Sequence, residues 1–184
     1  MAPTKNNKDS IVLDACVLAP MPLCDTLLRL AEHPAFFNPL WSEYLLQEVG
    51  QVLTKMGYSA MQRERRLNAM ITAFPEAAVE IFDEFIESID CPDPDDRHVL
   101  AAAIQGHANT IVTNNVRDFP EQCRAKYGIL CQTPDEFLIQ HFHLNPTLLL
   151  ERLDQQSAAI RQSRSELIVK LQKLTPLFAD LLRQ

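Results

Sequence analysis

Short apolar runs that alternate with longer segments of helical periodicity are the feature that most constrains the fold of this 184-residue chain. The first run spans residues 11–13 and the second spans residues 110–113. Each has the length and composition of a buried strand, and helical patterns fill the sequence between them. Because strands separated by helices form βαβ units, we expect a three-layer α/β/α, Rossmann-like domain with a central parallel sheet.

Capping residues indicate where several helices begin. Ser42 and Ser59 precede segments with helical periodicity, and these segments are expected to end at Gly57 and before Pro75. A capping box with proline at the first helical position, residues 133–136, predicts another helix start. The pattern of residues 76–89 is compatible with helix or strand and leaves both open.

Acidic side chains follow the two apolar runs. Asp14 ends the first run, and Asp118 follows the second after a short connection. The carboxyl ends of parallel strands meet at one sheet edge, where ligands bind in open α/β folds. Carboxylates that converge there repel one another unless a hard cation such as Mg²⁺ is bound, so the sequence suggests a metal site. Taken alone, Asp14 is equally compatible with a solvated carboxylate at the sheet edge.

Two further acids stand on predicted helices. Glu48 lies on the helix that Ser42 caps, and Asp96 stands where a turn rich in aspartate enters a helix. Aspartates near a helix N-terminus commonly cap it or complement its dipole. We expect capping for Asp95 and chemistry for Asp96. His98 is expected to pack or to face solvent, because two positions along a helix point to different faces.

Composition limits the possible partners and compartments. The net charge of −7 disfavours nonspecific binding to a polyanion. Arg63, Arg65 and Arg66 form a local basic cluster, and we favour a solvated helix face over a phosphate-binding patch. The five cysteines lack CxxC spacing and are expected to be reduced, mostly buried thiols. No run of about 20 apolar residues and no apolar leader is present, so we expect no membrane association and a cytoplasmic protein.

The chain lacks the phosphate-binding motifs of other α/β proteins. No GxGxxG follows the first strand, and GxxxxGK[ST] is absent. A receiver-type phosphoacceptor domain also gathers acids at strand ends, but it requires paired acids after the first strand and a lysine after the last. Asp14 is single and that lysine is missing, which makes this alternative the weaker one.

Four segments in the same order resemble the motifs of PIN-domain ribonucleases, most closely the toxin nucleases of VapBC toxin–antitoxin systems. The resemblance covers about residues 10–142. The segments are residues 12–14 (VLD), 48–49 (EV), 96–103 (DRHVLAAA) and 111–119 (IVTNNVRDF).

The resemblance implies a function, a cofactor and site residues. Members of the family hydrolyse RNA with Mg²⁺ or Mn²⁺ held by acidic side chains. The resemblance implies that four acids are catalytic and bind the metal: Asp14, Glu48, Asp96 and Asp118. It also implies that three polar residues line the site: Thr113, Asn115 and Asp93. It further implies an RNA substrate, a cognate antitoxin protein and a possible homodimer.

This sequence departs from the family pattern at two positions. Cys16 stands where members often have serine, asparagine or threonine, and Asn115 stands where others have aspartate. A weaker second metal site is compatible with the second change. An alternative that keeps the fold is therefore a catalytically degenerate PIN domain that acts as a binding module.

The resemblance also divides the chain. We expect a polar N-terminal tail (residues 1–9), a PIN-like nuclease domain (residues 10–143) and a helical C-terminal extension (residues 144–184). Asn145 is expected to cap the first helix of the extension, and Thr175 the last. The apolar stripes of these helices either pack on the core, which we favour, or contact a second copy or the antitoxin.

Overall fold

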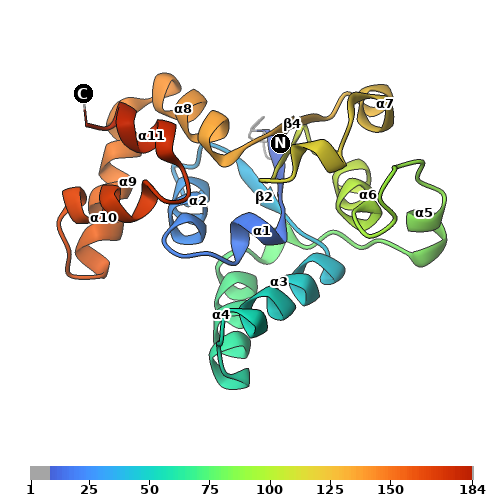
Figure 1. Ribbon diagram of the computed structural model, residues 1–184, viewed down its shortest axis with the longest axis horizontal. Coiled ribbons are helices and arrows are strands. Elements are labelled where there is room, and N and C mark those ends of the chain that lie inside the picture. Colours follow the sequence, from blue (N-terminus) through green and yellow to red (C-terminus); the bar gives the residue numbers. More distant parts are fainter. Residues whose placement is uncertain (1–8, 184) are drawn as a thin grey trace, which may run out of the picture.

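Four parallel strands form the central sheet. The computed structural model describes residues 9–183, and in it the strands lie in the spatial order β2-β1-β3-β4 (Figure 1). Their bounds are Ser10–Leu13 (β1), Asn38–Leu40 (β2), Thr110–Val112 (β3) and Leu130–Gln132 (β4). β1 pairs in parallel with both β2 and β3, and its apolar residues are buried. The parallel sheet predicted from the two apolar runs is confirmed.

Helices and short 3-10 turns connect the strands. In chain order they are α1 (Ala15–Leu18), α2 (Leu23–Ala31), α3 (Glu43–Lys55), α4 (Ala60–Ala73), η1 (Pro75–Ala77), α5 (Asp83–Glu87), α6 (Arg97–Gln105), η2 (Val116–Asp118), α7 (Glu121–Arg124), η3 (Ala125–Tyr127), α8 (Pro134–Leu144), α9 (Pro146–Ala159), α10 (Arg164–Leu171) and α11 (Pro176–Leu181).

The helices cover both faces of the sheet. α6 packs on β1 and β3, whereas α2 contacts β2 and α8 contacts β4. In Figure 1 the sheet lies between α2 and α8 on one side and α6 on the other, and the α3–α4 hairpin projects away from it. Because both faces are covered, β1 and β3 are buried along nearly their whole length. The three-layer α/β/α arrangement is therefore confirmed.

Side-chain caps begin the helices where the sequence placed them. The Ser42 hydroxyl accepts a hydrogen bond from the Leu45 amide at 3.3 Å, and Ser59 forms a capping box with α4. The capping box at residues 133–136 is also present. Thr175 is an exception, because its hydroxyl donates to the Leu171 carbonyl instead of capping α11.

The segment that the sequence left undecided is mostly irregular. Residues 76–89 contain part of η1, the short helix α5 and a single parallel bridge between Trp41 and Ala78. The bridge continues the direction of β2 only briefly. Neither a full strand nor a long helix forms there.

The C-terminal helices pack on the core. α9 contacts α2, and α11 contacts α8. At the first contact, buried Gln156 accepts a hydrogen bond from the Thr26 hydroxyl at 2.8 Å and donates to the Pro22 carbonyl at 3.0 Å. Buried Arg152 donates to the carbonyl oxygens of Glu32 and Pro34, both at 3.3 Å. These bonds fix α9 against both ends of α2.

At the C-terminal end of the described chain, Phe178 of α11 is fully buried in the core. Residues 1–8 of the predicted tail lie outside the described residues, whereas the Asp9 carbonyl accepts a hydrogen bond from the Asn38 amide at 2.9 Å. None of the helices within residues 9–183 has the length and hydropathy of a membrane span.

We expect Gln156→Leu to lower the free energy of unfolding by about 1–3 kcal/mol, because the Thr26 hydroxyl and the Pro22 carbonyl each lose one of their buried hydrogen bonds. Urea denaturation followed by circular dichroism measures the change. Glu151→Gln, at an exposed position of the same helix, serves as the control and should have no effect. Equal stability of both variants would contradict the role assigned to this contact.

Candidate functional site

Asp14 lies where β1 passes into α1. Its backbone amide donates to the Val112 carbonyl at 3.1 Å, which continues the pairing of β1 with β3. Its side chain caps α1 by accepting a hydrogen bond from the Ala15 amide at 2.6 Å. Only 4% of the residue is exposed, so Asp14 is not the solvated sheet-edge carboxylate that the sequence allowed.

Side chains from β1–α1 and from the end of β3 hold the Asp14 carboxylate. The Thr113 hydroxyl donates to Oδ2 at 2.5 Å, and the Cys16 thiol donates to the same oxygen at 3.2 Å. The Asn115 amide donates to the Thr113 hydroxyl oxygen at 2.9 Å, which fixes the direction of the hydroxyl proton. The orientation of Asp14 therefore depends on both strands.

Burial raises the pKa of Asp14, and the negative charge of Glu48 adds to this effect. The hydrogen bonds from Thr113 and Cys16 oppose the rise because they stabilise the ionised carboxylate. Together with the Ala15 amide, these two donors stabilise a carboxylate that is buried at the edge of an apolar sheet.

Asp96 occupies the N-cap position of α6, but its side chain makes no capping hydrogen bond. The prediction that Asp95 caps this helix is wrong, because the Asp93 carboxylate instead accepts from the Asp95 amide at 2.9 Å and stabilises the preceding turn. The Asp96 carboxylate therefore makes no capping hydrogen bond to the helix that it begins. A chemical role for Asp96 stays a prediction.

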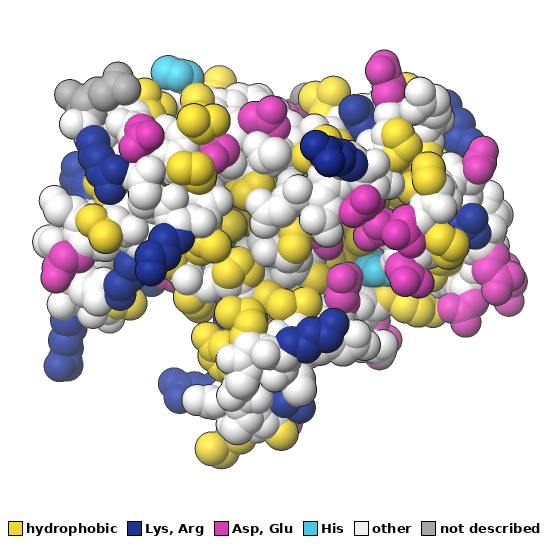
Figure 2. All heavy atoms as spheres, viewed as in Figure 1, with side chains coloured by type: hydrophobic (Ala, Val, Ile, Leu, Met, Phe, Trp, Pro, Cys, Tyr) yellow, Lys and Arg dark blue, Asp and Glu magenta, His cyan; other side chains and the backbone are white. Residues whose placement is uncertain are grey.

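Negative charge concentrates around Asp96. Burial raises its pKa from the ordinary value of 3.8 to about 6, and four nearby acids add to the rise in the order Asp118, Asp93, Asp14 and Glu48. Figure 2 shows acidic side chains gathered over the region of α3, α5 and α6. Five of the residues assigned from the sequence therefore lie within electrostatic reach of one another.

Glu48 has a neighbour that the sequence did not reveal. Nε2 of His98 lies 3.4 Å from a carboxylate oxygen of Glu48, and its ring stacks on Tyr44 with centroids 6.3 Å apart. The ring stacking agrees with the packing role expected for His98, and the contact with Glu48 adds a polar neighbour to that role. Residues 44 and 48 share one face of α3 by helical spacing, but no sequence signal links them to α6; only the packing of α3 on α6 does.

The remaining predicted residues lie on the loops that surround this edge. Asp118 is half-buried at the end of η2, and its amide donates to the Asn115 carbonyl at 2.9 Å. Asn115 and Asp93 are exposed. Thr113, by contrast, is fully buried and bonded directly to Asp14, so it supports that carboxylate more than it lines an open surface.

The donor set fits a hard divalent cation in chemical type and charge. Carboxylate oxygens are the ligands that Mg²⁺ prefers, and the raised pKa of Asp96 reflects repulsion that a cation would relieve. Within residues 9–183, however, no three His, Cys, Asp or Glu side chains are arranged closely enough to hold a metal ion. Cation binding therefore requires these side chains to move closer together.

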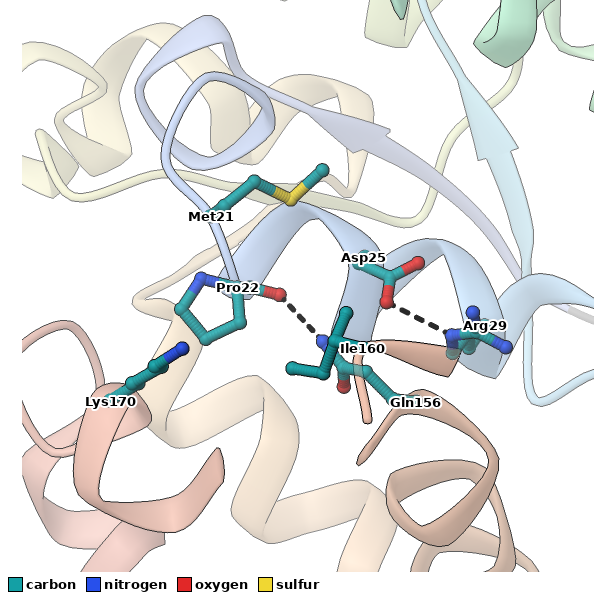
Figure 3. Close-up of a pocket in the computed structure, with 7 residues that line it drawn as sticks. All are labelled: Met21, Pro22, Asp25, Arg29, Gln156, Ile160 and Lys170. Carbon is teal, nitrogen blue, oxygen red and sulfur yellow. Dashed lines mark hydrogen bonds and ion pairs between the residues drawn. The ribbon is translucent and has the colours of Figure 1, made fainter. Parts of the chain in front are cut away.

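A separate cavity lies away from the acidic edge. It has a volume of about 420 Å³ and lies between α2 and the C-terminal helices, lined by Met21, Pro22, Ile160 and Lys170 among others (Figure 3). None of the clustered acids lines it. Because the clustered acids lie elsewhere, the acidic edge remains the candidate site.

The arginine cluster on α4 is only partly solvated. Arg63 donates to the Tyr58 carbonyl at 3.1 Å, and Arg66 donates to the Leu18 carbonyl at 2.7 Å. Two further nitrogens of Arg66 are buried without a partner. The favoured interpretation of a solvated helix face therefore holds for Arg65, which is exposed, but not for Arg66.

Comparison with protein families supplies the remaining observation. The family model described as PIN domain matches residues 10–117, which is more than half of the chain and includes Asp14, Glu48 and Asp96. The chain belongs to the PIN domain family. The predicted resemblance is thus confirmed, and the four-stranded parallel sheet is the PIN-like sheet that it implied.

A relative extends the comparison over a shorter region. "Putative ribonuclease VapC50" of Mycobacterium tuberculosis is 45% identical to this chain over 49 residues, which are 27% of this chain and 29% of that protein. The match thus spans less than a third of the length of this relative. No solved structure matches the chain.

The raised pKa of Asp96 predicts how stability depends on pH without metal. Because folded Asp96 holds its proton more tightly than the unfolded chain does, its ionisation favours unfolding, and this effect grows from about pH 4 to about pH 6. In EDTA, we expect Asp96→Asn to gain about 1 kcal/mol over the unaltered protein across this interval, after allowing for solvent screening. Denaturant titrations at several pH values measure the difference.

Asp95→Asn is the matched control for this experiment, because Asp95 is exposed and adjacent. Its stability should follow that of the unaltered protein at every pH. A constant difference between Asp96→Asn and the unaltered protein from pH 4 to pH 7 would show that Asp96 does not sit in the repulsive field described above.

Proposed function

We propose that this PIN domain is a metal-dependent endoribonuclease that hydrolyses RNA phosphodiester bonds and serves as the toxin of a type II toxin–antitoxin pair. The observation that carries the proposal is the electrostatic cluster of Asp14, Glu48, Asp93, Asp96 and Asp118 at the carboxyl edge of the sheet. Nuclease chemistry accounts for such a cluster, because a cation both binds the acids and neutralises the phosphodiester.

The proposed cofactor is Mg²⁺ or Mn²⁺. When bound, such an ion lowers the pKa of a coordinated water and stabilises negative charge on the phosphodiester. Asp14 and Asp96 are the principal proposed ligands, with Asp118 completing the set and Glu48 either binding directly or orienting the attacking water. All four supply hard oxygen atoms, which suits either ion better than a soft metal.

The residues around the acids have definite tasks in this proposal. Thr113 and Cys16 occupy Oδ2 of Asp14, whereas Oδ1 accepts the Ala15 amide and keeps its second lone pair for the site. His98 approaches Glu48 and limits its rotation, so that Glu48 can accept the proton of the attacking water. Hydrolysis then adds hydroxide to phosphorus, and the leaving ribose oxygen takes up a proton.

Partners and location follow from the family resemblance and remain part of the proposal. The substrate is RNA, the partner is a cognate antitoxin protein, and a homodimer is compatible with the chain. A cytoplasmic location fits this role. We also propose that residues 10–143 form the nuclease domain and that residues 144–184 form an extension that buttresses α2 and α8.

A second function keeps the fold but not the chemistry. A catalytically degenerate binding module is the alternative, and it would be favoured if the protein bound no metal although all four acids are present. The two functions differ in one measurable property, the binding of a divalent cation at the acidic edge.

Cleavage of a mixed pool of tRNA, rRNA and mRNA with Mg²⁺, with Mn²⁺ or with EDTA tests the nuclease function. We expect cuts only in the presence of metal, and a loss of about 100-fold or more in rate for Asp14→Asn and Asp96→Asn. Asp95→Asn is the control and should cut at the normal rate. Equal cutting by all variants, or none by the folded protein, would favour the binding module.

Thr113→Val tests the support of Asp14 separately from the acids. The substitution keeps the shape of the side chain and removes the donor to Oδ2. We expect a loss of about tenfold in Mn²⁺ affinity, measured by calorimetry, with the fold intact by circular dichroism. Thr110→Val, at a buried position on the same strand, is the control and should bind Mn²⁺ normally. Unchanged affinity for Thr113→Val would remove Thr113 from the site.

A further inference from the structure

Two buried cysteines meet between the loops that carry the acidic residues. Cys91 lies in the connection between α5 and α6, and Cys123 lies in α7; their sulfur atoms are 3.5 Å apart although they are 32 positions apart in sequence. Cys91 is 1% exposed and Cys123 is 3% exposed. A buried cysteine commonly acts as a small apolar residue, but two sulfurs in contact can also form a bond.

Each sulfur is tied to a segment of the proposed site. Cys91 donates its thiol hydrogen to the Asp118 carbonyl at 3.4 Å, and it precedes the turn that contains Asp93 and Asp96. Cys123 donates to the Pro120 carbonyl at 3.1 Å, in the segment that follows Asp118. In Figure 1, α7 lies beside α6, so the two segments flank the same edge.

The two cysteines differ in their position relative to the surface. Cys123 lines a surface cavity of about 270 Å³ together with Pro92, Pro120 and Gln122. Cys91 does not line it. The cavity therefore admits a small oxidant to Cys123 first.

We infer that Cys91 and Cys123 form a reversible disulfide when the protein meets a hydroperoxide, and that this crosslink weakens cation binding at the acidic edge. The second part of the inference rests on the proposed function, whereas the crosslink itself does not. The oxidant is a small hydroperoxide because the cavity at Cys123 is small and partly polar.

The disulfide forms in two steps. The Cys123 thiolate attacks one oxygen of the hydroperoxide, the O–O bond breaks, and the departing oxygen takes up the thiol proton, which leaves a sulfenic acid on Cys123. The Cys91 sulfur then attacks the Cys123 sulfur, the S–O bond breaks, and the hydroxide leaves as water with the Cys91 proton. Two thiols lose two electrons and the hydroperoxide gains them.

Formation of the disulfide would remove the hydrogen bond from the Cys91 thiol to the Asp118 carbonyl. A disulfide sulfur has no proton, so the Asp118 carbonyl loses its donor. The sulfurs must also approach from 3.5 Å to about 2.05 Å, which draws the Asp93–Asp96 turn toward α7. Outer-sphere changes of this kind typically lower metal affinity by about 10- to 100-fold, and we expect about tenfold here.

Treatment of the full-length chain with hydrogen peroxide, followed by peptide mapping, tests the crosslink directly. We expect one linked peptide pair that contains Cys91 and Cys123, reversed by dithiothreitol and absent from Cys91→Ser and Cys123→Ser. Cys131→Ser is the matched control and should crosslink normally. A reduced Cys91–Cys123 pair after treatment, in protein that remains folded, would overturn the inference.

Calorimetry with Mn²⁺ on the same samples tests the effect on the site. We expect oxidation to lower the Mn²⁺ affinity of the unaltered protein about tenfold and to leave that of Cys91→Ser constant. The same fall is expected for Cys16→Ser, and it would exclude oxidation of Cys16 as the cause. Serine keeps a donor near the Asp118 carbonyl. An unchanged affinity after crosslinking would overturn the regulatory part. Failure of the reduced protein to bind Mn²⁺ would contradict the proposed function, while the peptide map would still decide the crosslink.

Discussion

The parallel pairing of β1 with β3 is the contact on which the candidate site depends. It sets Leu13 opposite Val112, so the residues that follow, Asp14 and Thr113, leave the sheet side by side. The hydroxyl of Thr113 then reaches the Asp14 carboxylate at 2.5 Å. Because a one-residue change of register turns every side chain of a strand to the opposite face, any slip of this pair would separate the carboxylate from its donor. The buried apolar faces of the two strands make such a slip costly.

Electrostatics divides the acids of the site into two kinds. Asp14 is buried and compensated by hydrogen bonds from three groups, so its charge is compatible with the folded core. Asp96 has no capping bond and faces the charges of its neighbours, so its ionisation opposes folding in the absence of a cation. Concentrated like charge of this sort is typical of sites in which a ligand supplies the missing opposite charge, and it explains why stability and cation binding should be linked in this protein.

The elements outside the sheet have two different relations to that edge. α9 is joined to α2 by buried polar groups such as Gln156 and Arg152, and it supports the helix layer far from the acids. The α5–α6 connection and α7, in contrast, carry or flank Asp96 and Asp118 and meet through a pair of thiols. A change in the C-terminal helices should therefore alter stability, whereas a change at the thiol pair should alter the site itself.

The sequence alone determined the local features of this protein. Apolar runs predicted β1 and β3, and hydroxyl residues predicted the starts of α3, α4 and α8, because such signals arise within a few residues of one another. The short motifs around Asp14, Glu48 and Asp96 resemble those of PIN domains, and the family match over residues 10–117 includes all three acids. Tertiary structure decided what depends on contacts between distant segments. The approach of His98 to Glu48, the burial of Asp14 and the meeting of two cysteines 32 positions apart arise from helix and loop packing, for which the sequence contains no periodic signal.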